Sequence, residues 1–177
     1  MDSDKVGQHI LHEFDQELDD IRNKVMAMGG LVEEQLANGL RALLENDRDL
    51  GEQVDSGDYR VNSYDVEIDE ECTRIIALRQ PAARDLRVLV TIIRIIADLE
   101  RIGDEGAKLG RFAMEVADGG EQTDGTMQLG VEHLGEHAKR MLHDTLDILA
   151  RMDASAAVRV AEEESKIDHE YEAVMRQ

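Results

Sequence analysis

The fold is decided by the longest apolar run of the chain, Leu86-Arg87-Val88-Leu89-Val90-Thr91-Ile92-Ile93-Arg94-Ile95-Ile96, and by the acidic segment that follows, Ala97-Asp98-Leu99-Glu100-Arg101-Ile102-Gly103-Asp104. Apolar residues spaced by three and four predict the buried face of one helix, here Leu86, Val90, Ile93 and Ala97. The same spacing continues to Glu100 and Asp104, so two carboxylates fall where the pattern predicts core. Because an unpaired buried carboxylate is costly, we expect a metal ion, basic side chains or water to meet this pair.

The composition favours a helical bundle. Hydrophobic residues make up 42% of the 177 residues, which is enough for one good core or two small ones. Aromatic residues are only 3%, there is one proline, and the remaining apolar residues suit helices better than a β-sandwich. The sequence therefore predicts an all-α protein.

The formal net charge of −20 argues against nucleic-acid binding, because phosphate contacts need a clustered excess of Lys and Arg. Cations or basic protein surfaces are better partners, although the acids also suit a merely solvated surface. The N-terminal residues lack the pattern of a secretory signal, and the apolar run is too short to span a bilayer. A single cysteine, Cys72, excludes an intrachain disulfide and fits an inert core thiol. We expect a cytoplasmic protein without direct membrane insertion.

Apolar periodicity predicts five helices. They cover about 14–43, 50–79, 81–117 and 134–149, and a fifth runs from 156 to the end of the sequence. Pro81 separates the second from the third, because proline disfavours helical geometry in the residue before it. Three glycines on the third helix are spaced so as to let another backbone approach closely, namely Gly103, Gly106 and Gly110.

Two segments of the chain repeat. Leu40–Asp47 resembles Leu146–Asp153, and Asp65–Asp69 resembles Glu164–Asp168. The offsets differ by seven residues, which leaves the buried helix face unchanged. The sequence thus predicts a first three-helix bundle over 1–118, a linker over 119–125, and the first two helices of a second bundle over 126–177.

Three acid pairs stand four residues apart, so that each pair projects from one side of a helix. They are Asp65 with Asp69, Glu100 with Asp104, and Glu164 with Asp168. Like charges at this spacing repel, and Mg²⁺, Mn²⁺, iron or zinc held by carboxylate oxygens would relieve the repulsion. In so acidic a chain, however, such pairs also arise by chance.

Several segments together resemble the PhoU family of phosphate-specific transport system accessory proteins over the whole chain. The segments are Met26–Glu33, Asp65–Asp69, Ile75–Pro81 with Asp85–Arg87, and Glu100–Asp104. The resemblance implies two tandem three-helix bundles whose second and third helices carry acid pairs able to hold multinuclear iron or zinc clusters. It also implies a cytoplasmic, non-enzymatic homodimer that acts between the ATPase of a phosphate ABC transporter and a sensor histidine kinase, repressing the phosphate-starvation response when phosphate is plentiful.

Carried over by this resemblance, the first metal site consists of Asp65 and Asp69 facing Glu100 and Asp104. A second site starts with Glu164 and Asp168, and its other half belongs on a further helix that this sequence does not include. We therefore expect a C-terminally truncated second bundle.

Two other functions stay open. A carboxylate-bridged di-iron enzyme is disfavoured because no histidine here has a glutamate three residues before it. A metal-free interaction scaffold, whose acid pairs meet only water and arginine, remains an alternative. Basic residues also recur every seven positions along the third helix, at Arg87, Arg94, Arg101 and Lys108. These either pair with acids on neighbouring helices or form a docking face for a partner.

Overall fold

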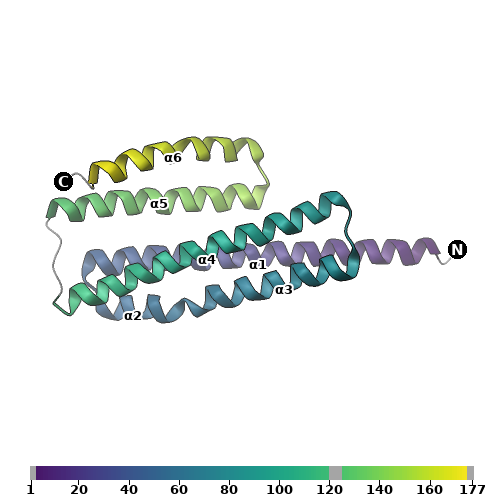
Figure 1. Ribbon diagram of the computed structural model, residues 1–177, viewed down its shortest axis with the longest axis horizontal. Helices are drawn as coiled ribbons and strands as arrows, with labels where there is room; N and C mark the ends of the chain where they lie inside the picture. The colour runs from purple at the N-terminus through teal and green to yellow at the C-terminus, as the bar shows by residue number, and fades with distance from the viewer. Residues whose placement is uncertain (1–2, 120–124, 175–177) are drawn as a thin grey trace.

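The computed structural model describes residues 3–119 and 125–174, with side chains for 13–119, 128–162 and 171–172. All regular structure in these ranges is helical, as predicted (Figure 1). The helices are α1 (Ser3–Glu45), α2 (Arg48–Gly57), α3 (Tyr59–Arg79), α4 (Ala83–Ala117), α5 (Gly125–Arg151) and α6 (Ala154–Val174). None of these helices, over the described residues, is both long and apolar enough to cross a membrane.

The main core lies between α1, α3 and α4, which pack along one another (Figure 1). Each of the three helices contributes aliphatic side chains that are almost completely buried. The largest are Ile21, Met28 and Val32 on α1, Val61, Ile68 and Ile75 on α3, and Leu89 and Ile96 on α4. Cys72 is fully buried among them, which confirms its position as a core thiol.

The buried face of α4 differs from the predicted one. Leu86 and Val90 are each 38% exposed and Ala97 is exposed, whereas the buried positions are Leu89, Ile92, Ile96, Leu99 and Gly103. The prediction was wrong because the first half of α4 is apolar on more than one side, so spacing alone did not select the core face. The consequence concerns the acids: Glu100 and Asp104 lie half-buried at the edge of the core and replace none of its residues.

Glycines fix the orientation of α4 against α1 and α2. A Cβ atom added to Gly39 would lie 2.6 Å from the carbonyl oxygen of Gly106, and one added to Gly51 would lie 2.6 Å from that of Gly110. Both distances are too short for real atoms. The close backbone approach predicted for the second half of α4 is therefore confirmed at Gly106 and Gly110, whereas Gly103 meets the side chain of Val61.

The single helix predicted over 50–79 is interrupted at Asp58, between α2 and α3. The carboxylate of Asp58 accepts hydrogen bonds from Gln35 Nε2 at 2.7 Å and from Asn62 Nδ2 at 2.9 Å. The Gln35 amide also donates to the carbonyl oxygen of Gly103 at 3.0 Å, and Gln35 is only 8% exposed. A buried side chain of α1 thus holds the interruption, and apolar spacing carries no sign of such a contact.

The two turns that the internal repeat matches have the same geometry. Asn46 and Met152 both have positive φ, 55° and 54°, and the aspartate that follows each accepts hydrogen bonds from the next helix. Asp47 accepts from Leu50 N at 3.0 Å, and Asp153 accepts from Ala156 N at 3.0 Å. The amide of each aspartate also donates to the carbonyl five residues earlier. The repeated turn is therefore confirmed.

The pair α5 and α6 packs on the first bundle through α1 (Figure 1). Gly29 of α1 accommodates Leu146, and Gly135 of α5 accommodates Leu40; an added Cβ would lie 2.6 Å from the leucine in each case. Among the described helices, α6 contacts α5 alone. An apolar groove of about 260 Å³ runs between α5 and α6. The division into two bundles stays a prediction, and most of the predicted linker lies outside the described residues.

Candidate functional site

The predicted first metal site is an acidic cluster on α3 and α4, and the structure brings its two halves to the same side of the bundle. Asp65 and Asp69 lie one turn apart on α3, and Glu100 and Asp104 lie one turn apart on α4. Asp65 is close enough to Glu100 for its charge to raise the pKa of the Glu100 carboxyl. We call these four residues the acidic cluster.

Burial and repulsion raise the pKa of two members of the acidic cluster. For Glu100 the pKa rises first because of burial, then because of the charges of Asp104, Asp65 and Asp58. For Asp65 the pKa likewise rises because of burial and then because of the charge of Asp69. The acidic cluster therefore holds negative charge at a cost.

Asp58 is a neighbour of this cluster that the sequence prediction missed. Its charge also raises the pKa of Glu100, and its side chain is held at the α2–α3 interruption by Gln35 and Asn62. The signal available in the sequence was its position seven residues before Asp65, which places both on one helix face. With both oxygens already accepting hydrogen bonds, Asp58 adds charge to the cluster and connects it to α1.

Within the described side chains, none of the four members of the acidic cluster forms an ion pair with Lys or Arg. A neighbouring acid pair on α3 behaves differently. Lys24 of α1 bridges Glu67 and Glu71 at 2.8 and 2.7 Å, and hydrogen bonds to these carboxylates raise the pKa of Lys24 to about 12. Among the described side chains, one acid pair of α3 is thus neutralised by Lys24, and the pair Asp65 and Asp69 forms no ion pair with a basic residue.

The donor chemistry of the acidic cluster suits hard cations, since every ligand on offer is a carboxylate oxygen. The arrangement is looser than a metal centre: across the described residues, no three His, Cys, Asp or Glu side chains are placed to hold one metal ion. Of the predicted second site, Glu164 and Asp168 fall on α6, but their side chains lie outside the described residues.

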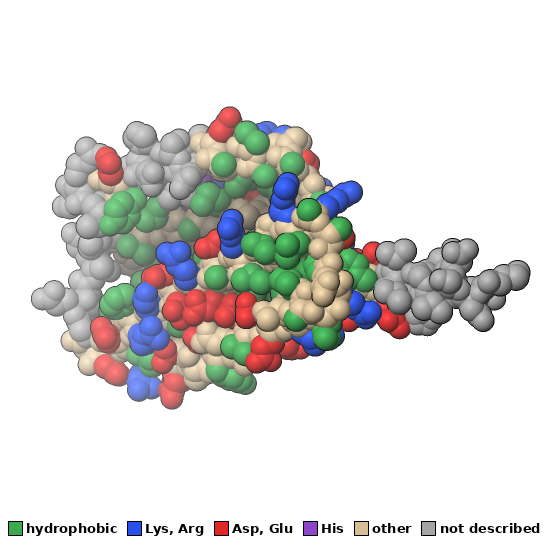
Figure 2. All heavy atoms as spheres, turned by 45° about the vertical axis from the view of Figure 1, so that its right-hand side comes forward, with side chains coloured by type: hydrophobic (Ala, Val, Ile, Leu, Met, Phe, Trp, Pro, Cys, Tyr) green, Lys and Arg blue, Asp and Glu red, His purple; other side chains and the backbone are tan. Residues whose placement is uncertain are grey.

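Figure 2 shows one face of the molecule, where acidic side chains gather beside an exposed apolar area. On α4, Leu86 and Val90 are exposed, and Glu100 and Asp104 lie further along the same side of the helix. Acidic and apolar groups are therefore neighbours on the surface.

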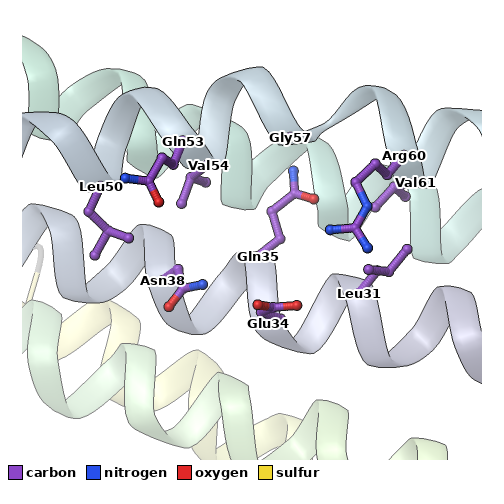
Figure 3. A pocket seen from close by; sticks show the side chains of 10 residues that line it. All are labelled: Leu31, Glu34, Gln35, Asn38, Leu50, Gln53, Val54, Gly57, Arg60 and Val61. Carbon is purple, nitrogen blue, oxygen red and sulfur yellow. The ribbon is translucent and has the colours of Figure 1, made fainter.

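A small polar pocket of about 190 Å³ lies between α1, α2 and α3, next to the α2–α3 interruption (Figure 3). Glu34 and Asn38 line it from α1, and Gln53 and Arg60 line it from the opposite side. Gln35 extends from α1 toward Gly57 in the same view. The volume is below that of ordinary small-molecule sites, which are roughly 300–1,000 Å³.

Cys72 supplies no reactive thiol to the acidic cluster or to the polar pocket. It is fully buried, and its surroundings raise the pKa of the thiol to about 11, first by burial and then through the charges of Asp69 and Glu71. Because the thiolate is the reactive form, Cys72 is inert at neutral pH. The acidic cluster on α3 and α4 is therefore the stronger candidate for function.

Comparison with known proteins gives consistent matches. A family model described as PhoU domain matches residues 25–113 and 131–177. The phosphate-specific transport system accessory protein PhoU of Escherichia coli strain K12 is 47% identical over 177 residues, covering 100% of this chain and 72% of that protein. A homolog from Pseudomonas aeruginosa is 41% identical with the same coverage of both chains.

Solved structures agree in fold. The crystal structure of PhoU from Pseudomonas aeruginosa superimposes with a TM-score of 0.87 at 42% identity, over 92% of this chain and 77% of that one. The phosphate transport system regulatory protein PhoU from Streptococcus pneumoniae gives a TM-score of 0.81 at 28% identity, over 91% and 74%. By sequence and by fold, the chain belongs to the PhoU family.

Proposed function

We propose that this protein is a cytoplasmic, non-enzymatic regulator of phosphate uptake and of the phosphate-starvation response. The observation that carries the proposal is the match of the entire chain, at 47% identity, to a phosphate-specific transport system accessory protein. In this proposal the protein acts between the ATPase of a phosphate ABC transporter and a sensor histidine kinase, and it does so as a homodimer. The proposed regulator neither binds nucleic acid nor inserts into the membrane.

The regulatory role is tested by deletion of the gene in its host. Phosphate-responsive genes should become active in phosphate-rich medium, and the full chain supplied in trans should silence them again. Unchanged expression in the deletion strain would contradict the proposal. Sedimentation velocity of the purified protein tests the homodimer separately.

The second part of the proposal is that the acidic cluster binds a metal. Its support is a set of four partly exposed or half-buried carboxylates in which burial and neighbouring acids raise the pKa of Asp65 and Glu100, and which form no ion pair with Lys or Arg among the described residues. A multinuclear iron or zinc cluster would neutralise this charge, as would Mg²⁺ or Mn²⁺. Glu164 and Asp168 are proposed as part of a second such site. Bound metal would supply positive charge that draws α3 and α4 together.

Elemental analysis of protein purified without chelator tests the metal. The variant Glu100→Ala/Asp104→Ala should lose most of the bound metal. The matched control is Glu67→Ala/Glu71→Ala, which removes the same charge at the same spacing from the pair that Lys24 already neutralises. This control should retain the metal of the wild type.

A metal-free interaction scaffold is the second candidate, and one observation favours it. No three potential ligands converge on one point among the described side chains. Equal and negligible metal in the wild type and both variants would establish the scaffold and exclude the metal site.

A further inference from the structure

The outward face of α4 carries apolar and basic side chains that belong neither to the buried core nor to the acidic cluster. Leu86 and Val90 are each 38% exposed, Ala97 is exposed, and Ile93 is half-buried beside them. These are the residues whose spacing predicted a buried helix face, and the described chain leaves that face uncovered. A helix face with apolar residues at steps of four and three is a typical contact face for a second helix.

A row of basic residues runs beside these apolar residues. Arg87 and Arg94 form no ion pair with any described residue. Arg101 forms a 3.8 Å ion pair with Asp98 in which both side chains are largely exposed, and its charge also acts on Glu100 to lower the pKa of that carboxyl. Lys108 pairs with Glu105 on its own helix. The row therefore does not pair with acids on neighbouring helices, although this was one of the two interpretations of its spacing in the sequence. The other interpretation was a docking face for a partner.

Arg87 and Arg94 form no ion pair among the described residues, although the chain has 40 acidic residues. Some basic side chains do reach carboxylates on other segments, as Arg79 does with Glu17, Arg111 with Asp55 and Arg48 with Asp118, whereas the exposed Arg41 and Arg60 do not. The exposed guanidinium groups of Arg87 and Arg94 are therefore available for an acidic partner.

The two rows lie side by side because seven residues make almost two helical turns. In the sequence, Arg87 directly follows Leu86 and Arg94 directly follows Ile93, both of which belong to the outward face. From Arg87 to Arg101 the basic row extends over about 21 Å. Figure 2 shows Lys and Arg side chains along one border of the exposed apolar area.

We infer that this face of α4 is a docking surface for an amphipathic helix of another protein, one that carries acidic side chains beside its apolar face. Straight apolar and basic rows of this length match the geometry of a partner helix, with Arg forming the charged contacts and Leu86, Val90 and Ala97 the apolar ones. The inference does not depend on the proposed metal or on the proposed place in phosphate signalling.

Two other occupants fit the charges less well. An anionic membrane surface is flat, so it would also meet Glu100 and Asp104, which continue the apolar row and would repel it. In a two-fold contact centred on this face, a second copy of this chain would bring its own arginine row against Arg87 and Arg94. A narrow helix can follow the arginine row without covering the acidic cluster.

The test uses two synthetic amphipathic peptides about 20 residues long, a length at which designed helices form in water. Both have leucines at steps of three and four, flanked by Glu in one peptide and by Lys in the other. Fluorescence anisotropy with the full chain should show binding of the Glu peptide, weakened by salt, and no comparable binding of the Lys peptide.

Charge reversal on α4 provides the decisive comparison. Arg87→Glu/Arg94→Glu should weaken binding of the Glu peptide by about tenfold or more and create binding of the Lys peptide. The matched control is Arg41→Glu/Arg60→Glu, which makes the same charge change at exposed arginines of α1 and α3 that have no ion pair in the described chain. The control should bind the Glu peptide as the wild type does.

Four results would overturn the inference: equal binding of both peptides, equal loss in the control variant, tighter binding to anionic vesicles than to the Glu peptide, or a dimer that Arg87→Glu/Arg94→Glu dissociates. Circular dichroism and the thermal midpoint of each variant show whether the bundle is intact. We expect no change, because the side chains of Arg87 and Arg94 lie on the surface.

Discussion

At the scale of single residues, the acidic cluster lowers the stability of the folded protein. Glu100 and Asp65 have raised pKa values because they are partly buried and face like charges. A carboxyl group whose pKa is higher in the folded than in the unfolded protein opposes folding above that pKa. The cost disappears as the pH falls through the folded pKa toward the unfolded one.

This linkage predicts the effect of Glu100→Gln. Without metal at pH 7, the variant should be more stable than the wild type by about 0.5 kcal/mol, the size of like-charge pairs one helical turn apart. The advantage should shrink as the pH falls through the raised pKa of Glu100. Urea unfolding at several pH values, with chelator present, measures both. A variant that is less stable at pH 7 would show that the carboxylate stabilises the fold.

The residues of the acidic cluster were largely predictable, and their environment was not. Spacing in the sequence identified Asp65, Asp69, Glu100 and Asp104, because pairs four residues apart share a helix side. The contribution of Asp58 depends on Gln35, which lies 23 residues away on another helix. Such a contact follows from packing, and no local pattern encodes it.

At the scale of helices, the positions of glycines decide how closely α4 approaches its neighbours. An added Cβ at Gly51 would meet the backbone oxygen of Gly110, which cannot move aside as a side chain can. Gly30 is an exposed position of α1 where an added Cβ meets nothing within 4 Å. Of these two positions, only Gly51 lies in a contact that requires glycine.

We therefore expect opposite effects from the same substitution. Gly51→Ala should destabilise the protein by about 1–3 kcal/mol through overpacking. Gly30→Ala should stabilise it by up to about 1 kcal/mol, because alanine is the better helix former. Denaturant unfolding measures both changes. Similar effects at the two sites would contradict the close approach of α2 and α4.

Helix positions were more predictable than helix orientations. The boundary at Pro81 and the turn at Asn46-Asp47 are where the sequence placed them, because proline and capping residues act locally. The core face of α4 was misassigned because two apolar faces compete in its first half. The glycines of its second half would have resolved this, since Gly103, Gly106 and Gly110 continue the face of Leu89 and Ile96.

At the scale of the whole molecule, the α5–α6 pair is attached less extensively than the helices of the first bundle. Its described contacts to that bundle run through α1, where Gly135 and Gly29 receive Leu40 and Leu146. The Glu33 carboxylate additionally accepts a hydrogen bond from His143 Nδ1 at 2.8 Å, which raises the pKa of His143.

This arrangement predicts a local effect of Gly135→Ala. The added methyl group would displace Leu40 and loosen α5, so amide hydrogen exchange in α5 and α6 should accelerate. Exchange in α3 and α4 should change less, because Leu40 lies outside the buried cluster that these helices share with α1 and with Leu142 and Leu146 of α5. Mass spectrometry of exchanged peptides resolves the two regions, and uniform acceleration would show that the helices open together.

The two equivalent turns, Asn46-Asp47 and Met152-Asp153, also make it possible to measure cooperativity within one chain. Asp47→Ala and Asp153→Ala remove equivalent capping residues from different helix pairs, and Asp153 additionally accepts hydrogen bonds from the backbone and side chain of Ser155. If all helices unfold as one unit, both variants should lower a single thermal midpoint, by about 2–4 °C for Asp47→Ala and by at least as much for Asp153→Ala. If α5 and α6 unfold on their own, Asp153→Ala should shift an earlier transition that Asp47→Ala leaves in place. Differential scanning calorimetry distinguishes the two cases, with each turn serving as the internal standard for the other.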